Sequence, residues 1–139
     1  MHKRLIIIRG IPGSGKSTKA KEIIEQNKCK CEVTHHYEAD MFFELDGEYK
    51  WNPNKIHLAH QWCRDRVFDA LNFGHSCVVS NTFTTMKEMR PYIDFCVENK
   101  ISFKVIRCSG KYNNVHNVPD DTIQKMQDRF EDCPGEVFL

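Results

Sequence analysis

The sequence predicts an α/β protein with a central parallel sheet of four or five strands between two layers of helices. Two observations lead to this fold class. Short apolar segments alternate with longer segments of helical spacing, which is the pattern of repeated βαβ units. The first apolar segment, Leu5–Ile8, is also continuous, as expected for a strand buried on both faces of a parallel sheet. No repeat or change of composition divides the 139 residues, so we expect one domain spanning residues 1–139.

A glycine-rich turn follows the first strand. Residues 10–17 read G-I-P-G-S-G-K-S and match the phosphate-binding pattern G-x-x-x-x-G-K-[ST]. Gly10, Gly13 and Gly15 let the backbone curl tightly enough for its N–H groups to surround an oxyanion. The helix that begins at the end of the turn adds the positive end of its dipole. The sequence therefore predicts a nucleotide-binding protein with a P-loop.

The side chains of this P-loop have separate expected roles. Lys16 would place its charge near the β- and γ-phosphates, and the Ser17 hydroxyl would bind Mg²⁺. ATP and Mg²⁺ are therefore the expected cofactors. The residues expected to contact the nucleotide are Gly13, Ser14, Gly15, Lys16, Ser17 and Thr18.

The elements on either side of the P-loop are assigned from apolar spacing. We expect the first strand at residues 3–9 and a helix at 16–27 whose apolar residues share one face. A second strand is expected at 33–39, ending at Asp40. In this assignment Asp40 is the acidic residue at a strand's carboxyl end, whereas Glu38 lies within the strand.

A long helix is expected in the middle of the chain, after a loop over residues 43–52. Asn52 is a typical N-cap, Pro53 a typical first helical residue, and Gly74 a typical helix terminator. Apolar residues at helical spacing form the expected core stripe of this helix: Ile56, Ala59, Cys63, Val67, Ala70 and Leu71.

The last part of the chain continues the alternation. Strands are expected at 77–80 and 103–107, and helices at 86–99 and 119–131. Pro91 suggests that the first of these helices starts or kinks near Arg90.

Ligands of open parallel sheets bind beyond the carboxyl ends of the strands. Besides the P-loop, three positions fall there in this assignment: Asp40, Ser80–Asn81 and Arg107–Ser109. We therefore expect the site at these strand ends rather than in the core.

Charge is unevenly distributed along the sequence. The net charge is +1, but the first 31 residues carry eight lysines or arginines against two glutamates. A basic phosphate-binding end suits an anionic substrate, although the chain lacks the basic surface of a duplex DNA binder. The longest apolar run is too short to cross a bilayer, and Met1–Arg4 leaves no room for a signal peptide. We expect a soluble, cytoplasmic or nuclear protein with no membrane partner.

The seven cysteines raise the possibility of zinc or disulfide sites. No C-x-x-C pair occurs, and four of the five isolated cysteines lie in apolar helix or strand contexts. We expect free thiols that are mostly buried. His57 and His60 could share a helix face, but no third ligand is suitably spaced, so we interpret them as ordinary helix residues.

Seven motifs in one order give the chain a family resemblance. They are R-G-I-P-G-S-G-K-S-T, E-A-D-M-F-F, G-E-Y-K-W-N-P, A-H-Q-W, N-T, E-M-R-P-Y and N-V-H-N-V-P. The order resembles that of polynucleotide-kinase-like P-loop kinases, in particular the kinase domains related to Nedd4-binding protein 2. The 5′-kinase domain of bacteriophage polynucleotide kinase is a more distant match. The resemblance extends from about residue 3 to about residue 131.

The resemblance implies a kinase-type P-loop fold and transfer of the ATP γ-phosphate to a polynucleotide 5′-hydroxyl. It implies that Asp40 is the general base for the attacking hydroxyl, acting with Lys16. Arg66 matches a basic position of the family, and the N-T motif is Asn81 and Thr82, so these three residues are expected to contact the substrate.

The chain departs from the family pattern in two places. Ser80, Asn81 and Thr82 provide no carboxylate where relatives have an aspartate, which predicts weaker Mg²⁺ binding. The lid segment before the N-V-H-N-V-P motif is short and lacks the arginine of relatives. Four basic residues are candidates to replace that arginine: Lys111, Arg90, Arg107 and Arg129.

Two other functions fit the same motifs. In the first, the same phosphate transfer uses another acceptor than a nucleic-acid 5′ end, namely a hydroxyl on a small molecule or on a modified base. Alternatively, the protein is a nucleotide-binding module that has lost transfer activity, as the short lid and the missing carboxylate suggest. The P-loop identifies the nucleotide cofactor far better than the acceptor.

Overall fold

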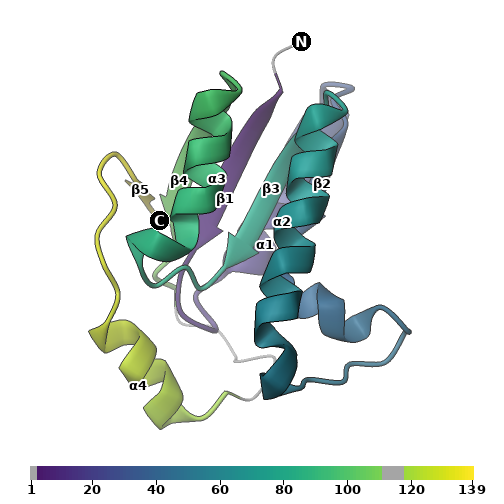
Figure 1. The fold of residues 1–139 in the computed structure, drawn as a ribbon. Helices are drawn as coiled ribbons and strands as arrows, with labels where there is room; N and C mark the ends of the chain where they lie inside the picture. Colours follow the sequence, from purple (N-terminus) through teal and green to yellow (C-terminus); the bar gives the residue numbers. More distant parts are fainter. Residues whose placement is uncertain (1–2, 111–117) are drawn as a thin grey trace.

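The computed structural model describes residues 3–110 and 118–139, and strands alternate with helices along the chain (Figure 1). The strands are β1 (Arg4–Arg9), β2 (Thr34–Tyr37), β3 (Ser76–Asn81), β4 (Ser102–Arg107) and β5 (Val137–Phe138). The α-helices are α1 (Lys16–Cys29), α2 (Ile56–Asn72), α3 (Met86–Glu98) and α4 (Asp120–Asp128). Two short 3₁₀ helices, η1 (Ala39–Glu44) and η2 (Pro53–Lys55), lie between β2 and α2.

The strands form one five-stranded sheet in the order β2-β3-β1-β4-β5. Each neighbouring pair is parallel, and Ile7 of β1 lies opposite Val79 of β3 and Val105 of β4. The carboxyl ends of the strands therefore meet at one edge, and α4 lies beyond that edge (Figure 1). This arrangement confirms the predicted fold class.

The central strand β1 is buried on both faces, as its continuous apolar sequence predicted. Ile6 and Ile8 face α1 and pack in a cluster with Ala20 and Ile23. On the other face, Leu5 and Ile7 belong to the larger cluster beneath α2 and α3. Helices thus cover both sides of the sheet, which gives three layers.

The long helix starts as the capping residues predicted, although its first turn is a 3₁₀ turn. Asn52 accepts a hydrogen bond from the Asn54 N–H at 2.9 Å, and Pro53 is the first residue of η2. The prediction that Ile56 belongs to the core stripe is wrong, because Ile56 is 39% exposed at the junction of η2 and α2. The others are buried: Ala59, Cys63, Val67, Ala70 and Leu71.

Pro91 lies inside α3 and does not mark its start. The helix begins at Met86, where the preceding Thr85 side chain accepts a hydrogen bond from the Glu88 N–H. The expected helix over 86–99 is therefore confirmed, and its N-cap is Thr85, six residues before Pro91, rather than a residue near Arg90.

The second strand is shorter than predicted, and its end changes the site. β2 stops at Tyr37, which pairs with Val79. The Ala39 N–H then donates to the Asn81 side-chain oxygen at 2.9 Å instead of continuing the ladder, and η1 begins there. Asp40 therefore lies on η1 and not at the end of a strand, and the expected strand over 33–39 is corrected.

A buried ion pair joins the end of β1 to the C-terminal segment. The Arg9 guanidinium donates to Glu136 Oε1 at 2.9 Å, and the two side chains are 0% and 2% exposed. Arg9 also donates to the Phe83 carbonyl oxygen at 3.0 and 2.7 Å, and its guanidinium stacks on Phe130. This pair holds the segment that carries β5, a strand to which the sequence analysis assigned no residues.

All seven cysteines are free, and five of them are buried, as predicted. The buried ones are Cys63, Cys77, Cys96, Cys108 and Cys133. Within residues 3–110 and 118–139, no helix has the length and apolar character to cross a membrane.

We predict that Arg9→Ala lowers the free energy of unfolding by up to ~3–5 kcal/mol, because it removes the nearer cation from the buried Glu136 carboxylate and leaves it with the more distant Arg107, at 3.6 Å. Urea unfolding of the purified variant measures the change. The control is Arg66→Ala, which removes a solvent-exposed pair with Asp69 and should cost at most ~1 kcal/mol. Equal losses for the two variants would show that the buried pair does not stabilise the fold.

Candidate active site

The P-loop runs from the end of β1 to the start of α1. Gly13 and Gly15 have positive φ angles of 81° and 97°, which L-residues with a Cβ rarely adopt. A Cβ on Gly10 would overlap the Ser14 hydroxyl and lie 2.7 Å from the Cys108 carbonyl oxygen. All three glycines are therefore required by the shape of the loop, as the motif predicted.

The ends of the neighbouring strands support the P-loop through backbone hydrogen bonds. The Gly10 N–H donates to the Thr82 carbonyl oxygen at 3.2 Å, and the Gly110 N–H donates to the Ser14 carbonyl oxygen at 3.1 Å. Ser14 is buried, and its hydroxyl has no hydrogen-bond partner among the described residues. An unpartnered buried hydroxyl in a glycine-rich loop at the start of a helix fits an anionic ligand.

Lys16 is the first residue of α1 and folds over the P-loop. Its ammonium group donates to the Ile11 carbonyl oxygen at 3.0 Å. Burial lowers the pKa of Lys16, whereas the charges of Glu38 and Asp40 act in the opposite direction. The cation and both carboxylates therefore lie within electrostatic range of one another.

Glu38 is the carboxylate in direct contact with the P-loop. Its Oε1 accepts hydrogen bonds from the Ser17 hydroxyl at 2.6 Å and from the Ser80 hydroxyl at 2.8 Å. The expectation that Glu38 lies within a strand is wrong, because β2 ends one residue before it. Glu38, and not Asp40, is thus the acidic residue that directly follows the carboxyl end of β2.

The surroundings of Glu38 favour its ionised form. Burial raises the pKa of this carboxyl, but hydrogen bonds from His36, Ser17 and Ser80 outweigh burial and lower the pKa to about 2. The His36 Nε2 atom lies 3.3 Å from Glu38 Oε1 and 2.8 Å from the Ser80 hydroxyl oxygen. The site therefore holds a fixed negative charge beside Ser17.

Asp40 lies two residues further along, on η1. The Tyr49 hydroxyl donates a hydrogen bond to this carboxylate, and the charge of Asp40 acts on both Lys16 and His60. The structure therefore brings Asp40 towards the P-loop, although from η1 rather than from a strand end. Its role as general base stays a prediction.

Asn81 and Thr82 make contacts that shape the site. Asn81 is buried, its side-chain oxygen accepts from the Ala39 N–H at 2.9 Å, and its amide nitrogen lies 3.8 Å from the Cys63 sulfur. Thr82 supports the P-loop through its backbone carbonyl. These contacts position η1 and the P-loop, and the expected contacts of both side chains with substrate stay predictions.

Arg66 lies in a different part of the molecule. It is exposed on α2, and its guanidinium pairs with Asp69 at 3.0 Å. It borders a hollow together with His35 and His75, near the amino ends of β2 and β3. The structure does not bring Arg66 to the P-loop, so its predicted substrate contact would have to involve a more distant part of the acceptor.

The four cations proposed to replace a lid arginine also differ in their surroundings. Arg107 pairs with Asp132 at 2.7 Å and lies over the Phe130 ring. Arg129 donates to the Thr84 hydroxyl at 3.1 Å, at the turn after β3, and Arg90 is exposed on α3. Lys111, the rest of the short lid segment and the first four residues of the N-V-H-N-V-P motif lie outside the described residues.

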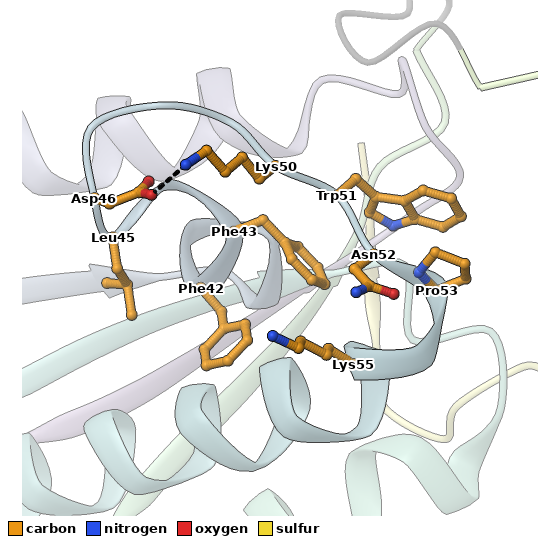
Figure 2. A pocket seen from close by; sticks show the side chains of 9 residues that line it. All are labelled: Phe42, Phe43, Leu45, Asp46, Lys50, Trp51, Asn52, Pro53 and Lys55. Atoms are coloured by element: carbon orange, nitrogen blue, oxygen red, sulfur yellow. Dashed lines mark hydrogen bonds and ion pairs between the residues drawn. The ribbon is translucent and has the colours of Figure 1, made fainter.

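An aromatic hollow of about 590 Å³ lies beside η1 and the start of α2. Figure 2 shows Trp51 and Pro53 along one side of it and Phe42 on the other. Two lysines line it, Lys55 and Lys50, and Lys50 is paired with Asp46 at 2.9 Å. Because Phe42 belongs to the same short helix as Asp40, the hollow adjoins the segment that carries the predicted base.

Comparisons with known proteins give one family and two relatives that match most of this chain. A family described as “AAA domain” matches residues 5–133. NEDD4-binding protein 2 of Homo sapiens is 26% identical over 137 residues, and the match covers 91% of this chain but 8% of the human protein. An uncharacterized protein of Pasteurella multocida is 31% identical over 146 residues, covering 97% of this chain and 82% of that protein.

Several solved structures share the fold at low sequence identity. A putative kinase from Chloroflexus aurantiacus has a TM-score of 0.69 at 15% identity, covering 100% of this chain and 87% of that one. The Mycobacterium tuberculosis APS kinase CysC in complex with AMPPNP and APS has a TM-score of 0.63 at 14% identity, covering 89% and 68%. The Pnkp1/Rnl/Hen1 complex has a TM-score of 0.60 at 18% identity, covering 89% and 38%. The fold is therefore that of P-loop kinases.

Proposed function

This chain belongs to the AAA-domain family, and on that premise we propose that it transfers the γ-phosphate of ATP to the 5′-hydroxyl of a polynucleotide. One observation carries the proposal: the phosphate-binding P-loop with Lys16 shares a strand edge with two carboxylates, Glu38 and Asp40. A P-loop alone indicates nucleotide binding, whereas phosphate transfer to a hydroxyl also needs a proton acceptor near the phosphates.

Nucleotide and metal binding are supported by the chemistry of the P-loop. The first N–H groups of α1 have no partners within the helix and can donate to phosphate oxygens, as can the Ser14 hydroxyl. Mg²⁺ prefers oxygen ligands and is usually held by few protein groups together with phosphates, which fits the Ser17 hydroxyl. In the described parts of the chain, no cluster of three or more His, Cys, Asp or Glu side chains offers a separate metal site. When bound, Mg²⁺ would neutralise charge on the transferred group.

The proposed reaction gives Asp40 and Lys16 separate roles. The acceptor oxygen forms a bond to the γ-phosphorus, the bond from that phosphorus to the β–γ bridging oxygen breaks, and ADP leaves. The proton of the acceptor hydroxyl passes to the Asp40 carboxylate, which the Tyr49 hydroxyl holds in place. Lys16 compensates the charge on the phosphate oxygens.

Three observations support a polynucleotide acceptor. Motif order resembles that of polynucleotide kinases, a solved structure with the same fold contains Pnkp1, and the hollow beside Asp40 offers the Trp51 ring as a surface on which a base can stack. A small hydroxyl compound is the second candidate, because one of the two lysines that line this hollow, Lys50, is already paired with Asp46 and Glu48, which leaves Lys55 as the lining lysine that can meet a phosphate backbone.

Radiolabelled ATP tests the proposal directly. The protein is incubated with γ-labelled ATP and either a 5′-hydroxyl oligonucleotide or a pool of small metabolites and modified nucleosides. Label on the oligonucleotide supports the proposed acceptor, and label on a small compound supports the second candidate. Label on neither, with nucleotide binding intact, would identify a binding module without transfer activity.

We expect Lys16→Ala to abolish transfer and to raise the dissociation constant for ATP by ~10–150-fold, because it removes a charge-assisted contact of ~1.5–3 kcal/mol. Fluorescence titration with a labelled ATP analogue measures the affinity. The control is Lys19→Ala, which removes a lysine that pairs with Glu22 on the same helix. Unchanged affinity and turnover in Lys16→Ala would refute the assignment of the P-loop.

Asp40→Asn should lower turnover by ~10²–10⁴-fold with little change in nucleotide affinity, because the amide keeps the shape of the side chain but cannot take a proton. Glu44→Gln, at the exposed end of the same short helix, is the matched control and should retain full turnover. Full turnover in Asp40→Asn would exclude Asp40 as the base.

Trp51→Ala should raise the KM for the oligonucleotide by ~5–150-fold and leave ATP affinity unchanged, since stacking of one base contributes ~1–3 kcal/mol. Phe73→Ala removes an exposed ring at the far end of α2 and serves as control. Steady-state kinetics over a series of oligonucleotide concentrations separates KM from kcat. If both variants behave alike, the hollow is not part of the acceptor site.

A further inference from the structure

The Glu38 carboxylate connects three segments that are far apart in the sequence. Ser17 is in the first turn of α1, Glu38 directly follows β2, and Ser80 is on β3. The same oxygen of Glu38 accepts hydrogen bonds from both serine hydroxyls, at 2.6 and 2.8 Å. The Glu38 side chain is only 19% exposed. These contacts make Glu38 part of the P-loop environment rather than of the protein surface.

The strand order explains why a residue after β2 can take this position. β3 lies between β2 and β1, so a carboxylate that follows β2 reaches the P-loop only by passing the end of β3. The residue that meets the carboxylate is Ser80, the last but one of β3, which is small and donates a hydrogen bond to it. An acidic residue at that position would place two negative charges side by side. A neutral end of β3 and an acidic residue after β2 are therefore complementary.

The direction of the Ser17 hydrogen bond has a chemical consequence. A hydroxyl has one proton and two lone pairs, and the Ser17 proton is donated to Glu38. The lone pairs of the Ser17 oxygen are then left for a cation, and the adjacent carboxylate supplies the negative charge that such a cation requires.

We propose that Glu38 supplies the carboxylate of the Mg²⁺ site, orienting the Ser17 hydroxyl and replacing the acidic residue that β3 lacks. This inference rests on the proposed use of ATP and Mg²⁺. It gives the two carboxylates separate tasks, because Glu38 supports the metal and Asp40, further along the chain on η1, remains the predicted base.

Binding measurements test the inference without relying on turnover. The dissociation constant for AMPPNP is measured in excess Mg²⁺ and in EDTA, and Mn²⁺ affinity is measured by electron paramagnetic resonance with AMPPNP bound. Glu38→Gln should lower the Mn²⁺ affinity and the Mg²⁺-dependent gain in AMPPNP affinity by ~10–100-fold. AMPPNP affinity in EDTA should not fall. Glu44→Gln is the control and should match the wild type in every measurement.

A second variant distinguishes metal support from a structural role. In Glu38→Gln/Ser80→Asp, the carboxylate is moved to β3, and Mn²⁺ affinity should recover most of the loss. If Glu38 only holds Ser17 and Ser80 in place, Glu38→Gln would weaken AMPPNP equally with Mg²⁺ and in EDTA, and the second substitution would restore nothing. That result would overturn the inference.

The outcomes also separate this inference from the proposed function. Wild-type Mn²⁺ affinity in folded Glu38→Gln overturns the role of Glu38 and leaves the phosphotransfer proposal standing, because transfer is assayed separately. A wild-type protein whose AMPPNP affinity does not depend on Mg²⁺ and that binds no Mn²⁺ overturns the metal inference, whereas the absence of label transfer to any acceptor overturns the phosphotransfer proposal. Asp40→Asn should keep the Mg²⁺-dependent gain in AMPPNP affinity. If Asp40→Asn loses this gain and Glu38→Gln retains it, the metal site is assigned to Asp40 instead.

Discussion

The buried guanidinium of Arg9 is the constraint on which the arrangement of the strand ends depends. A charge with no exposed surface is tolerated only when its donors are satisfied, and here the acceptors are Phe83, Thr84 and Glu136. These acceptors come from the turn after β3 and from the C-terminal segment. Arg9 therefore fixes both to the end of β1, the point from which the P-loop starts.

The candidate site follows from the order of the strands at that fixed edge. Because β3 separates β1 from β2, groups that meet at the P-loop must come from three strand ends at once. Hydrogen bonds at this edge therefore join separate segments. The bond from the Ala39 N–H to the Asn81 side chain ends β2 and positions η1. The bond from the Ser17 hydroxyl to Glu38 joins the start of α1 to the residue that follows β2.

Sequence patterns predicted the features that depend on neighbours in the chain. The β1 strand, the P-loop glycines and the Asn52 cap are local, and the structure confirms them. The end of β2 depends instead on a side chain 42 residues away, which accepts a hydrogen bond from the Ala39 N–H. The strand therefore ends two residues earlier than expected, which puts Glu38 at its carboxyl end and Asp40 on η1. The partner of Arg9 is 127 residues away, so no local pattern could reveal it.

That separation between Arg9 and Glu136 has a consequence for the order in which the chain folds. On the ribosome, Arg9 is synthesised 127 residues before the carboxylate with which it pairs. Until then the guanidinium is better solvated by water than buried, which opposes closure of the core around the end of β1. The final closure of the central strand therefore belongs to a late, long-range folding event, of the kind that is slow because a large loop must be ordered first.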